Sequence, residues 1–207
     1  MIIFSRELLK ENAGACIISE VKSSQNLYND IKKHGGRAIM WKTGHSLIKG
    51  KMKEEGAKLA GEMSGHIFFA DRYFGYDDAI YASCRLLEIL SRTDKKLEDL
   101  LSDVPRVFNT PEIRVDCPEE RKFKVVEKLK AYFREKYEII DIDGVRILFE
   151  DGWGLIRASN TQPMLVLRFE ANTPERLQEI RKMVESKLKE VASDFAKASS
   201  DRGNSRE

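Results

Sequence analysis

The sequence predicts an α/β domain followed by a smaller α+β domain. In the first half, short apolar runs alternate with helical patterns and are separated by glycines, which is typical of a mixed, mainly parallel sheet with helices on both faces. In the second half, strand-like runs joined by hairpin signals and accompanied by two helical patterns predict an antiparallel sheet. Between the halves, Pro105 and Pro111 interrupt the helical periodicity. We therefore expect domains at 1–106 and 107–198, followed by a disordered tail at 199–207.

The elements of the first domain follow from the spacing of its apolar residues. Helices are predicted where these residues recur every three or four positions, and strands where they form short runs bounded by turn residues. The strongest helical pattern places Ile80, Leu86, Leu87 and Leu90 on a buried face. In chain order we expect helices at 5–12, 24–34, 46–55, 77–90 and 96–101, and strands at 15–21, 37–41, 59–60 and 67–69.

The elements of the second domain are marked by turns and by alternation. Asp-Gly dipeptides at 143–144 and 151–152 favour tight hairpins, so the runs around them are expected to pair antiparallel. In the run 164–170, apolar residues alternate along the chain, which is typical of a strand with one buried face. We expect helices at 118–136 and 174–196, and strands at 113–115, 137–142, 145–149, 153–158 and 164–170.

The composition argues against several classes of partner. The 36 basic and 34 acidic residues are spread along the chain, so nothing indicates a surface for nucleic acid or an anionic membrane. No apolar run reaches the roughly 20 residues that a membrane-spanning helix needs, and residues 1–4 are too short for a signal peptide. Cys16, Cys84 and Cys117 form no CxxC pair and are interpreted as buried, reduced thiols. We therefore expect a cytoplasmic protein without nucleic-acid or membrane partners.

The first candidate binding loop is the segment 61–66 (GEMSGH), which separates two strand-like runs. In an extended chain alternate residues face the same side, so Glu62, Ser64 and His66 are expected to converge on one small ligand. A carboxylate accepts hydrogen bonds from sugar hydroxyls, and serine and histidine can donate or accept them. From the spacing alone, an ordinary polar turn with an N-capping serine and a structural histidine remains an alternative.

The second candidate is the segment 157–163 (RASNTQP), together with an arginine on the strand that follows. Two guanidinium groups, two hydroxyls, an amide and exposed backbone N–H groups are the donors that a phosphate prefers. The predicted phosphate ligands are Arg157, Ser159, Asn160, Thr161 and Arg168. The alternative is an ordinary hairpin loop with surface arginines.

The third candidate consists of Lys22, after the first predicted strand, and His45, after the second. The carboxyl ends of parallel strands meet at one edge of a sheet, where ligands usually bind. Both side chains are therefore candidate partners for a phosphate or a proton. Taken singly, a solvated lysine and a helix-capping histidine remain the alternatives.

These loops resemble those of a known family. The stretch from Trp41 to Leu90 resembles the third domain of bacterial phosphomannomutase/phosphoglucomutases, which are α-D-phosphohexomutases. GEMSGH is similar to that family's sugar-recognition loop, and RASNTQP is similar to the phosphate loop of its fourth domain. The motifs follow each other in the family's order, and the resemblance extends from Ser5 to Val191. The chain thus resembles the third and fourth domains, the C-terminal half of the family's enzymes, with a short remnant of the preceding domain at its start.

The resemblance implies binding of hexose phosphates, namely mannose or glucose 1- or 6-phosphate, for the interconversion of hexose 1-phosphate and hexose 6-phosphate. Glu62 and Ser64 would hydrogen-bond the sugar hydroxyls, and His66 would line the same pocket. Lys22 and His45 match positions near the reacting phosphate, where a cation would support the transfer. Mannose and glucose are not distinguished, because the loop would contact hydroxyls that both sugars share.

The resemblance also implies which parts of the chemistry lie elsewhere. Residues of RASNTQP, helped by Arg168, would hold the non-reacting phosphate. The family's reaction needs a phosphoserine in the first domain and a magnesium ion held by aspartates in the second, and neither loop occurs in this sequence. The segment 141–144 is expected to be a hairpin turn and not a metal loop. We therefore expect no catalytic residue and no metal ligand in this chain, and no mutase turnover by the chain alone.

Three interpretations follow from these patterns. The first is half of a mutase, either one piece of a split enzyme or an excised part of a longer one, with an N-terminal mutase fragment as a candidate partner. The second is a non-catalytic fragment that binds sugar phosphates, or a remnant of a mutase gene. The third, a nucleic-acid module, is disfavoured because Arg157 and Arg168 are not accompanied by exposed stacking aromatics.

Overall fold

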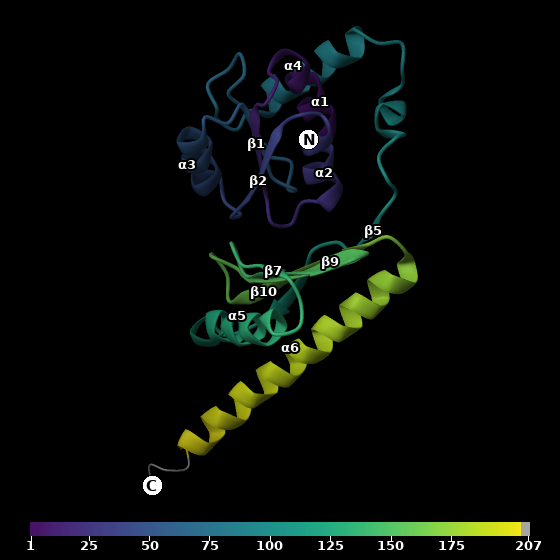
Figure 1. Ribbon diagram of the computed structural model, residues 1–207. Coiled ribbons are helices and arrows are strands. Elements are labelled where there is room, and N and C mark those ends of the chain that lie inside the picture. Colours follow the sequence, from purple (N-terminus) through teal and green to yellow (C-terminus); the bar gives the residue numbers. More distant parts are fainter. Residues whose placement is uncertain (204–207) are drawn as a thin grey trace. The chain divides into compact units, whose positions relative to one another are not determined.

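The computed structural model describes the backbone of residues 1–203 and the side chains of residues 1–194, and the chain divides into two compact units (Figure 1). The first unit is Met1–Pro105, and the second begins at Arg106. Each unit has its own sheet and its own hydrophobic core. The predicted order of fold classes, α/β and then α+β, is confirmed.

The sheet of the first unit consists of β1 (Cys16–Glu20), β2 (Arg37–Trp41), β3 (Leu59–Gly61) and β4 (Ile67–Phe69). The order in the sheet is β2-β1-β3-β4. β1 is parallel to β2 and β3, and β4 is antiparallel to β3. The pairing aligns Glu20 with Trp41 and Ser19 with Gly61, so the three parallel strands end at the same edge of the sheet.

Helices cover both faces of this sheet (Figure 1). They are α1 (Ile2–Glu11), α2 (Gln25–Lys33), α3 (His45–Glu55), α4 (Ala79–Ser91) and the short 3-10 helix η1 (Leu97–Leu101). Successive residues of a strand point to opposite faces. Accordingly, Ile17 of β1 and Phe69 of β4 pack with residues of α1, α2 and α4. Ile18 and Phe68 pack on the other face, against Ile48 of α3.

The buried face of α4 differs from the predicted one. Of the four leucine and isoleucine side chains expected there, Ile80 is 80% exposed and Leu87 is 65% exposed. The helix instead buries Ala82, Ile89 and the charged Arg85. The prediction was wrong at these positions because it assigned the buried face from apolar residues alone and excluded an arginine from it.

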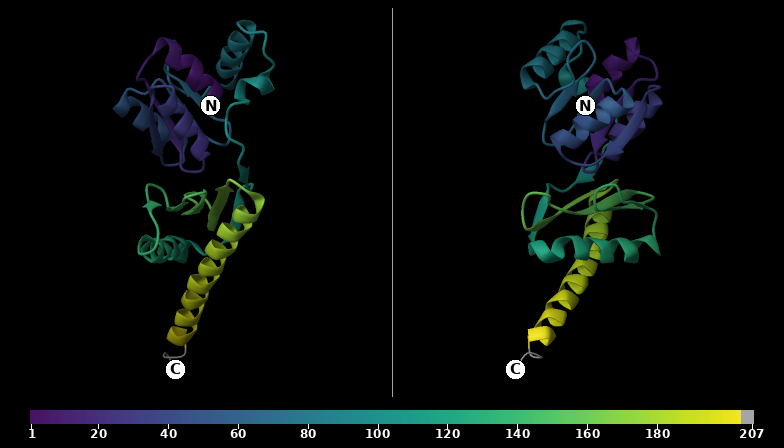
Figure 2. Two further views of the ribbon diagram at one scale, coloured as in Figure 1. Left: turned by 45° about the vertical axis from the view of Figure 1, so that its right-hand side comes forward. Right: turned by 90° about the vertical axis from the view of Figure 1, so that its left-hand side faces the viewer.

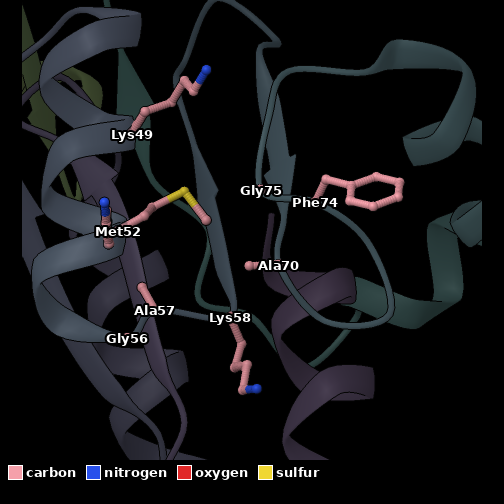
Figure 3. A pocket seen from close by; sticks show the side chains of 9 residues that line it. Lys49, Met52, Gly56, Ala57, Lys58, Ala70, Phe74 and Gly75 are labelled. Carbon is pink, nitrogen blue, oxygen red and sulfur yellow. The ribbon is translucent and has the colours of Figure 1, made fainter.

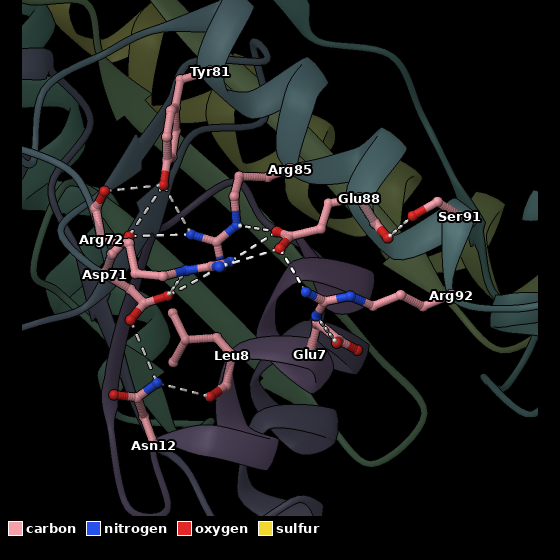
Figure 4. A network of polar contacts seen from close by, with 10 residues as sticks. All are labelled: Glu7, Leu8, Asn12, Asp71, Arg72, Tyr81, Arg85, Glu88, Ser91 and Arg92. Carbon is pink, nitrogen blue, oxygen red and sulfur yellow. Dashed lines mark hydrogen bonds and ion pairs between the residues drawn. The ribbon is translucent and has the colours of Figure 1, made fainter.

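Arg85 is buried, and polar groups of the preceding loop surround its guanidinium group (Figure 4). Its Nη2 donates to the carboxylate of Asp71 over 3.0 Å, and its Nη1 donates to the Asp71 carbonyl over 3.1 Å. The ring of Phe69 lies 4.6 Å from the guanidinium carbon. Glu88, one turn along α4, accepts from Arg72 over 2.7 Å and pairs with Arg85 over 3.3 Å. This network ties α4 to the loop that follows β4.

The second unit contains an antiparallel sheet of β5 (Phe108–Asn109), β6 (Ile113–Asp116), β7 (Ile139–Ile140), β8 (Val145–Phe149), β9 (Gly152–Ala158) and β10 (Met164–Ala171). The order is β5-β10-β9-β8-β7, and β6 also pairs with β10. The helices are α5 (Glu119–Arg134) and α6 (Pro174–Gly203). All strand pairs of this sheet are antiparallel, as the sequence predicts.

Both helices of this unit pack on one face of the sheet (Figure 2). Leu165, Leu167 and Phe169 of β10 belong to the core that also includes Leu129 of α5 and Val184 of α6. The intervening residues of β10 point to the opposite face because side chains alternate along a strand. The alternation recognised in the sequence thus identifies the helix-covered face correctly.

The last helix is longer than the sequence predicts. α6 continues to Gly203, so residues 199–203 of the expected tail are helical, and residues 204–207 lie outside the described part of the chain. Within residues 1–203, no helix combines the length and the apolar character needed to cross a membrane.

The cysteines differ from one another in exposure. Cys16 and Cys117 are buried, and burial raises the pKa of both thiols. Cys84 is exposed on α4, so the expectation of a buried thiol was wrong at this position. The buried face of α4 contains Ala82, Arg85 and Ile89, and Cys84 does not belong to it.

Candidate functional site

Three polar loops lie at the carboxyl edge of the first unit's sheet. Lys22 follows β1, His45 follows β2 at the start of α3, and the segment 62–66 follows β3. Parallel pairing of the three strands brings these segments to one edge, as the sequence predicts for Lys22 and His45.

The carboxylate of Glu20 joins the three loops. This side chain is 0% exposed. Its Oε2 accepts the backbone N–H of Lys22 over 2.8 Å and the hydroxyl of Thr43 over 3.0 Å, and its Oε1 accepts the backbone N–H of Met63 over 3.1 Å. The ammonium group of Lys22 lies 4.0 Å from Oε1. Sequence reasoning missed Glu20, although a charged residue inside a buried-strand run was a usable signal.

Glu62 shapes the loop that contains GEMSGH. Its Oε1 accepts the backbone N–H of Gly44 over 2.9 Å, and its Oε2 accepts the hydroxyl of Ser64 over 3.1 Å. The turn is closed by the Glu62 N–H, which donates to the His66 carbonyl over 2.9 Å. Glu62 is buried, whereas Ser64 is exposed. Each carboxylate oxygen has a second lone pair with which to accept from a ligand hydroxyl.

His66 contacts an aspartate and a second histidine. Its Nδ1 is 2.7 Å from Oδ2 of Asp77, and its ring centroid is 4.0 Å from that of His45. Nε2 of His45 is 3.9 Å from the same Asp77 oxygen. The sequence predicted a helix that begins at Asp77, but α4 begins only at Ala79. The structure therefore adds Asp77 to the neighbourhood of the two histidines.

The start of α4 holds Asp77 in place. Asp78 is the N-cap of this helix, and its carboxylate accepts the Tyr81 N–H over 2.8 Å and the Tyr73 hydroxyl over 2.6 Å. These two donors, that of Tyr73 first, lower the pKa of Asp78. Oδ1 of Asp77 in turn accepts the Ile67 N–H over 3.1 Å. Both aspartates are thus fixed to the backbone around β4 and α4.

The loop that contains RASNTQP connects β9 and β10 in the second unit. The hydroxyl oxygen of Ser159 accepts the N–H groups of Thr161 and Gln162 over 3.3 and 3.2 Å. Asn160 and Thr161 are exposed. Ser159 therefore orders the turn internally and leaves the side chains of the next two residues at the surface.

Lys122 of α5 supports this loop from within the unit. It is 1% exposed, and its Nζ donates to the carbonyl of Ser159 over 2.6 Å and to that of Gln162 over 3.1 Å. Glu119, which is exposed, pairs with the same ammonium group over 2.7 Å. Sequence reasoning did not identify Lys122, because nothing in a lysine-rich helix distinguishes a buried lysine from its solvated neighbours.

The two arginines of the predicted phosphate site share one face of the second sheet. Arg157 of β9 is opposite Val166 of β10, and Arg168 is two residues further along β10. Side chains two residues apart on a strand point the same way, here away from the helix-covered face. Nε of Arg157 donates to Asp143 over 3.0 Å, and Nη2 of Arg168 donates to Asn109 over 3.4 Å.

The hairpin turn beside Arg157 yields a test of the fold. Gly144 has a φ of +83°, and a Cβ there would lie 2.3 Å from the Ile156 carbonyl oxygen. Gly144→Ala is expected to destabilise the second unit by about 2 kcal/mol or more, since it combines a left-handed backbone with a steric clash. Chemical denaturation of both proteins measures this difference.

Gly50→Ala is the matched control, because Gly50 lies within α3 and a Cβ there would meet nothing within 4 Å. This variant is expected to be about 0.5–1 kcal/mol more stable than the parent. Equal unfolding free energies for Gly144→Ala and the parent would contradict the close approach at the 143–144 turn.

A separate hollow of about 450 Å³ lies at the other end of β3 (Figure 3). Lys58, which directly precedes β3, and Phe74, which is exposed, both line it. The other lining residues are Lys49, Met52, Lys53, Gly56, Ala57, Ala70 and Gly75. None of the residues predicted from the sequence to bind a ligand lines this hollow.

Comparison with protein-family models agrees with this architecture. The model for the phosphoglucomutase/phosphomannomutase alpha/beta/alpha domain III matches residues 1–108, and the model for the phosphoglucomutase/phosphomannomutase C-terminal domain matches residues 112–187. The chain therefore belongs to the phosphoglucomutase/phosphomannomutase family. The first match begins at residue 1, so it includes α1.

Curated relatives and solved structures that are similar to this chain come from the same family. A phosphomannomutase/phosphoglucomutase from Pseudomonas syringae is 50% identical over 197 residues, which are 94% of this chain and 42% of the relative. A phosphoglucomutase/phosphomannomutase family protein from Burkholderia thailandensis superposes with a TM-score of 0.83 at 43% identity, over 92% of this chain and 40% of that one. The chain thus spans about two fifths of the length of these relatives.

A more distant structure shows the same fold. N-acetylphosphoglucosamine mutase from Aspergillus fumigatus, crystallised in complex with glucose 1,6-bisphosphate, superposes with a TM-score of 0.66 at 14% identity. The match covers 92% of this chain and 42% of that one.

Proposed function

We propose that this chain is the C-terminal half of a phosphomannomutase/phosphoglucomutase and binds a hexose phosphate for the interconversion of hexose 1-phosphate and hexose 6-phosphate. The observation that carries the proposal is that a buried charged residue holds each of the two loops in shape. Glu20 holds the loop that contains GEMSGH, and Lys122 holds the loop that contains RASNTQP. The sugar bisphosphate bound to the distant Aspergillus relative supports this class of ligand.

The sugar would be recognised by the first unit. Glu62 accepts from sugar hydroxyls through the lone pairs that Gly44 and Ser64 leave open, and the exposed Ser64 hydroxyl is a second partner. His66 lines the same pocket. Lys22 and His45, at the same sheet edge, provide positive charge or a proton near the reacting phosphate.

The non-reacting phosphate would be recognised by the second unit. Arg157 uses Nε to hold Asp143, and its remaining guanidinium donors suit a phosphate oxygen. The exposed side chains of Asn160 and Thr161 add an amide and a hydroxyl. Ser159 and Arg168 complete the predicted set.

The transfer step itself is proposed to depend on a phosphoserine and on magnesium bound outside these residues. The sequence contains neither of the two loops that supply them in the family. The histidine and aspartate cluster of the first unit does not fit magnesium, which prefers an octahedron of oxygen ligands. The chain alone is therefore expected to show no mutase turnover in an assay with magnesium, hexose 1-phosphate and bisphosphate activator, and an N-terminal mutase fragment is the proposed partner.

We also propose that the protein works in the cytoplasm. The thiols of Cys16, Cys84 and Cys117 are all free in the structure, which is typical of proteins from reducing compartments.

Titration of the purified chain with glucose 1-phosphate and mannose 1-phosphate, followed by amide chemical shifts, tests the proposal. Saturable shifts are expected around Glu62, Ser64 and Arg157. Glu62→Gln is expected to weaken binding at least about tenfold, which corresponds to about 1.4 kcal/mol, because the amide loses the charge and one acceptor oxygen.

Glu54→Gln is the matched control, because Glu54 lies on α3 and its side chain is 64% exposed. It is expected to bind like the parent protein. No saturation into the millimolar range by a folded sample, or equal affinity of Glu62→Gln and Glu54→Gln, would contradict the proposed binding site.

A further inference from the structure

Two imidazoles and one carboxylate of the first unit come together from three different segments. His45 is the first residue of α3, His66 ends the GEMSGH loop, and Asp77 precedes α4. One ligand atom from each lies within 4.8 Å of the others. Such a convergence is a geometric condition for a metal site, and it is not the aspartate-rich loop that the family uses for magnesium.

The donor atoms select the kind of cation. Two imidazole nitrogens and one carboxylate oxygen suit zinc, which accepts nitrogen and oxygen ligands in a tetrahedron. Magnesium prefers oxygen ligands only and gives up its water reluctantly. Three protein ligands leave the fourth zinc position for water or another small ligand.

The distances are compatible with a small adjustment on binding. Zinc–ligand bonds of about 2.0–2.1 Å in a tetrahedron place the ligand atoms about 3.3 Å from one another. Oδ2 of Asp77 is now 2.7 Å from Nδ1 of His66 and 3.9 Å from Nε2 of His45. The first of these separations must widen and the second must narrow, by roughly half an ångström each. The ligand atoms of the two histidines lie within 4.8 Å of each other and must also reach about 3.3 Å, which side-chain rotations can provide.

The surroundings of the cluster hold the Asp77 carboxylate in place and leave the two histidines accessible to solvent. Oδ1 of Asp77 accepts the Ile67 N–H over 3.1 Å, which fixes the carboxylate while Oδ2 points to the histidines. The buried Phe68 lies beside His45, with ring centroids 5.5 Å apart. The histidine side chains are 47% and 41% exposed, so an ion can enter from solvent. A ligand oriented by a backbone donor is a common feature of protein metal sites.

We propose that His45, His66 and Asp77 form a zinc-binding site. Binding replaces the hydrogen bond between His66 and Asp77, and the neutral imidazole of His66 then carries its one proton on Nε2, away from the ion. A second consequence rests on the proposed function: because zinc engages His45 and His66, it competes with the sugar phosphate for the same pocket.

Titration of the full chain with zinc chloride against a chromophoric chelator tests the site directly. The parent protein is expected to bind one zinc ion, and His45→Ala and Asp77→Asn are each expected to weaken this binding at least about tenfold. Cobalt(II) chloride is expected to give the intense visible absorption of a tetrahedral site in the parent and not in His45→Ala. Magnesium chloride is expected not to displace either ion.

Two variants control for other ligands. His34→Ala removes the third histidine, which contacts Asp30, and Cys84→Ser removes the exposed thiol. Both are expected to retain the zinc affinity of the parent protein. Equal zinc affinity of His45→Ala and the parent, or loss of binding in Cys84→Ser, would overturn the proposal. A circular dichroism spectrum of each variant establishes that it is folded.

A competition experiment separates this proposal from the proposed function. Zinc is expected to weaken glucose 1-phosphate binding to the parent protein at least about tenfold when added at one hundred times its dissociation constant. If zinc binds as expected and glucose 1-phosphate does not bind in its absence, the function proposal fails and the zinc site stands. If glucose 1-phosphate binds and zinc does not, the zinc site fails alone.

Discussion

Glu20→Ala is expected to destabilise the first unit by about 3–5 kcal/mol and to abolish measurable binding of glucose 1-phosphate. The buried carboxylate accepts hydrogen bonds from Lys22, Thr43 and Met63, and these residues belong to three different loops. Each bond to a charged acceptor contributes about 1.5–3 kcal/mol, and removal of the side chain also leaves a cavity. Loss of this one acceptor releases the ends of all three parallel strands together.

Thermal unfolding gives the stability, and amide chemical shifts show which loops change. Glu54→Ala is the control: Glu54 is a solvated partner of Lys51 on α3, and its loss is expected to change stability by no more than about 0.5 kcal/mol. The role of Glu20 would be refuted if Glu20→Ala had the same stability as the parent protein and the same amide shifts at Thr43 and Met63. The loops would then be held by other contacts.

The placement of Lys22 and His45 at one sheet edge could be predicted because it depends on chain topology. A strand–helix–strand pattern predicts parallel pairing, and parallel pairing places the ends of the strands at one edge. The alternation of β10 likewise predicted which of its residues enter the core. Both inferences use the helical and strand periodicities of side chains, which local sequence patterns indicate.

The roles of Glu20 and Asp77 could not be predicted in the same way. Glu20 acts through Thr43 and Met63, which are distant in sequence, and these contacts depend on the register of three strands. Asp77 falls just outside α4, and its proximity to His45 follows only from the positions of three separate segments.

The buried face of α4 shows a second limit of pattern reasoning. Ile80 and Leu87 have the spacing of a buried face, yet the helix turns Arg85 inward, where it donates hydrogen bonds to the carbonyl and carboxylate of Asp71. A hydrophobicity pattern does not identify a buried guanidinium group, because the hydrogen-bond partners that stabilise it lie in a separate loop. The fold class was therefore predictable, whereas the contacts by which buried charged groups fix the loops were not.

Lys122→Met is expected to leave the second unit folded but to weaken glucose 1-phosphate binding more than about tenfold. Methionine fills the space of the aliphatic stem, whereas the two bonds from Nζ to the carbonyls of Ser159 and Gln162 are lost. With a buried carbonyl left unsatisfied, the unfolding free energy is expected to fall by about 1–3 kcal/mol. Amide shifts at Asn160 and Thr161 are expected to change most, because these residues lie between the two carbonyls.

The neighbouring Lys124 provides the control for charge, because it is exposed on the same helix. Lys124→Met removes the same positive charge from α5 without touching the loop, so it is expected to bind glucose 1-phosphate like the parent protein. If Lys122→Met and Lys124→Met weakened binding equally, the effect would come from net charge and not from loop order. If only Lys122→Met did so, a buried lysine that contacts no ligand would be established as the residue that positions the phosphate loop.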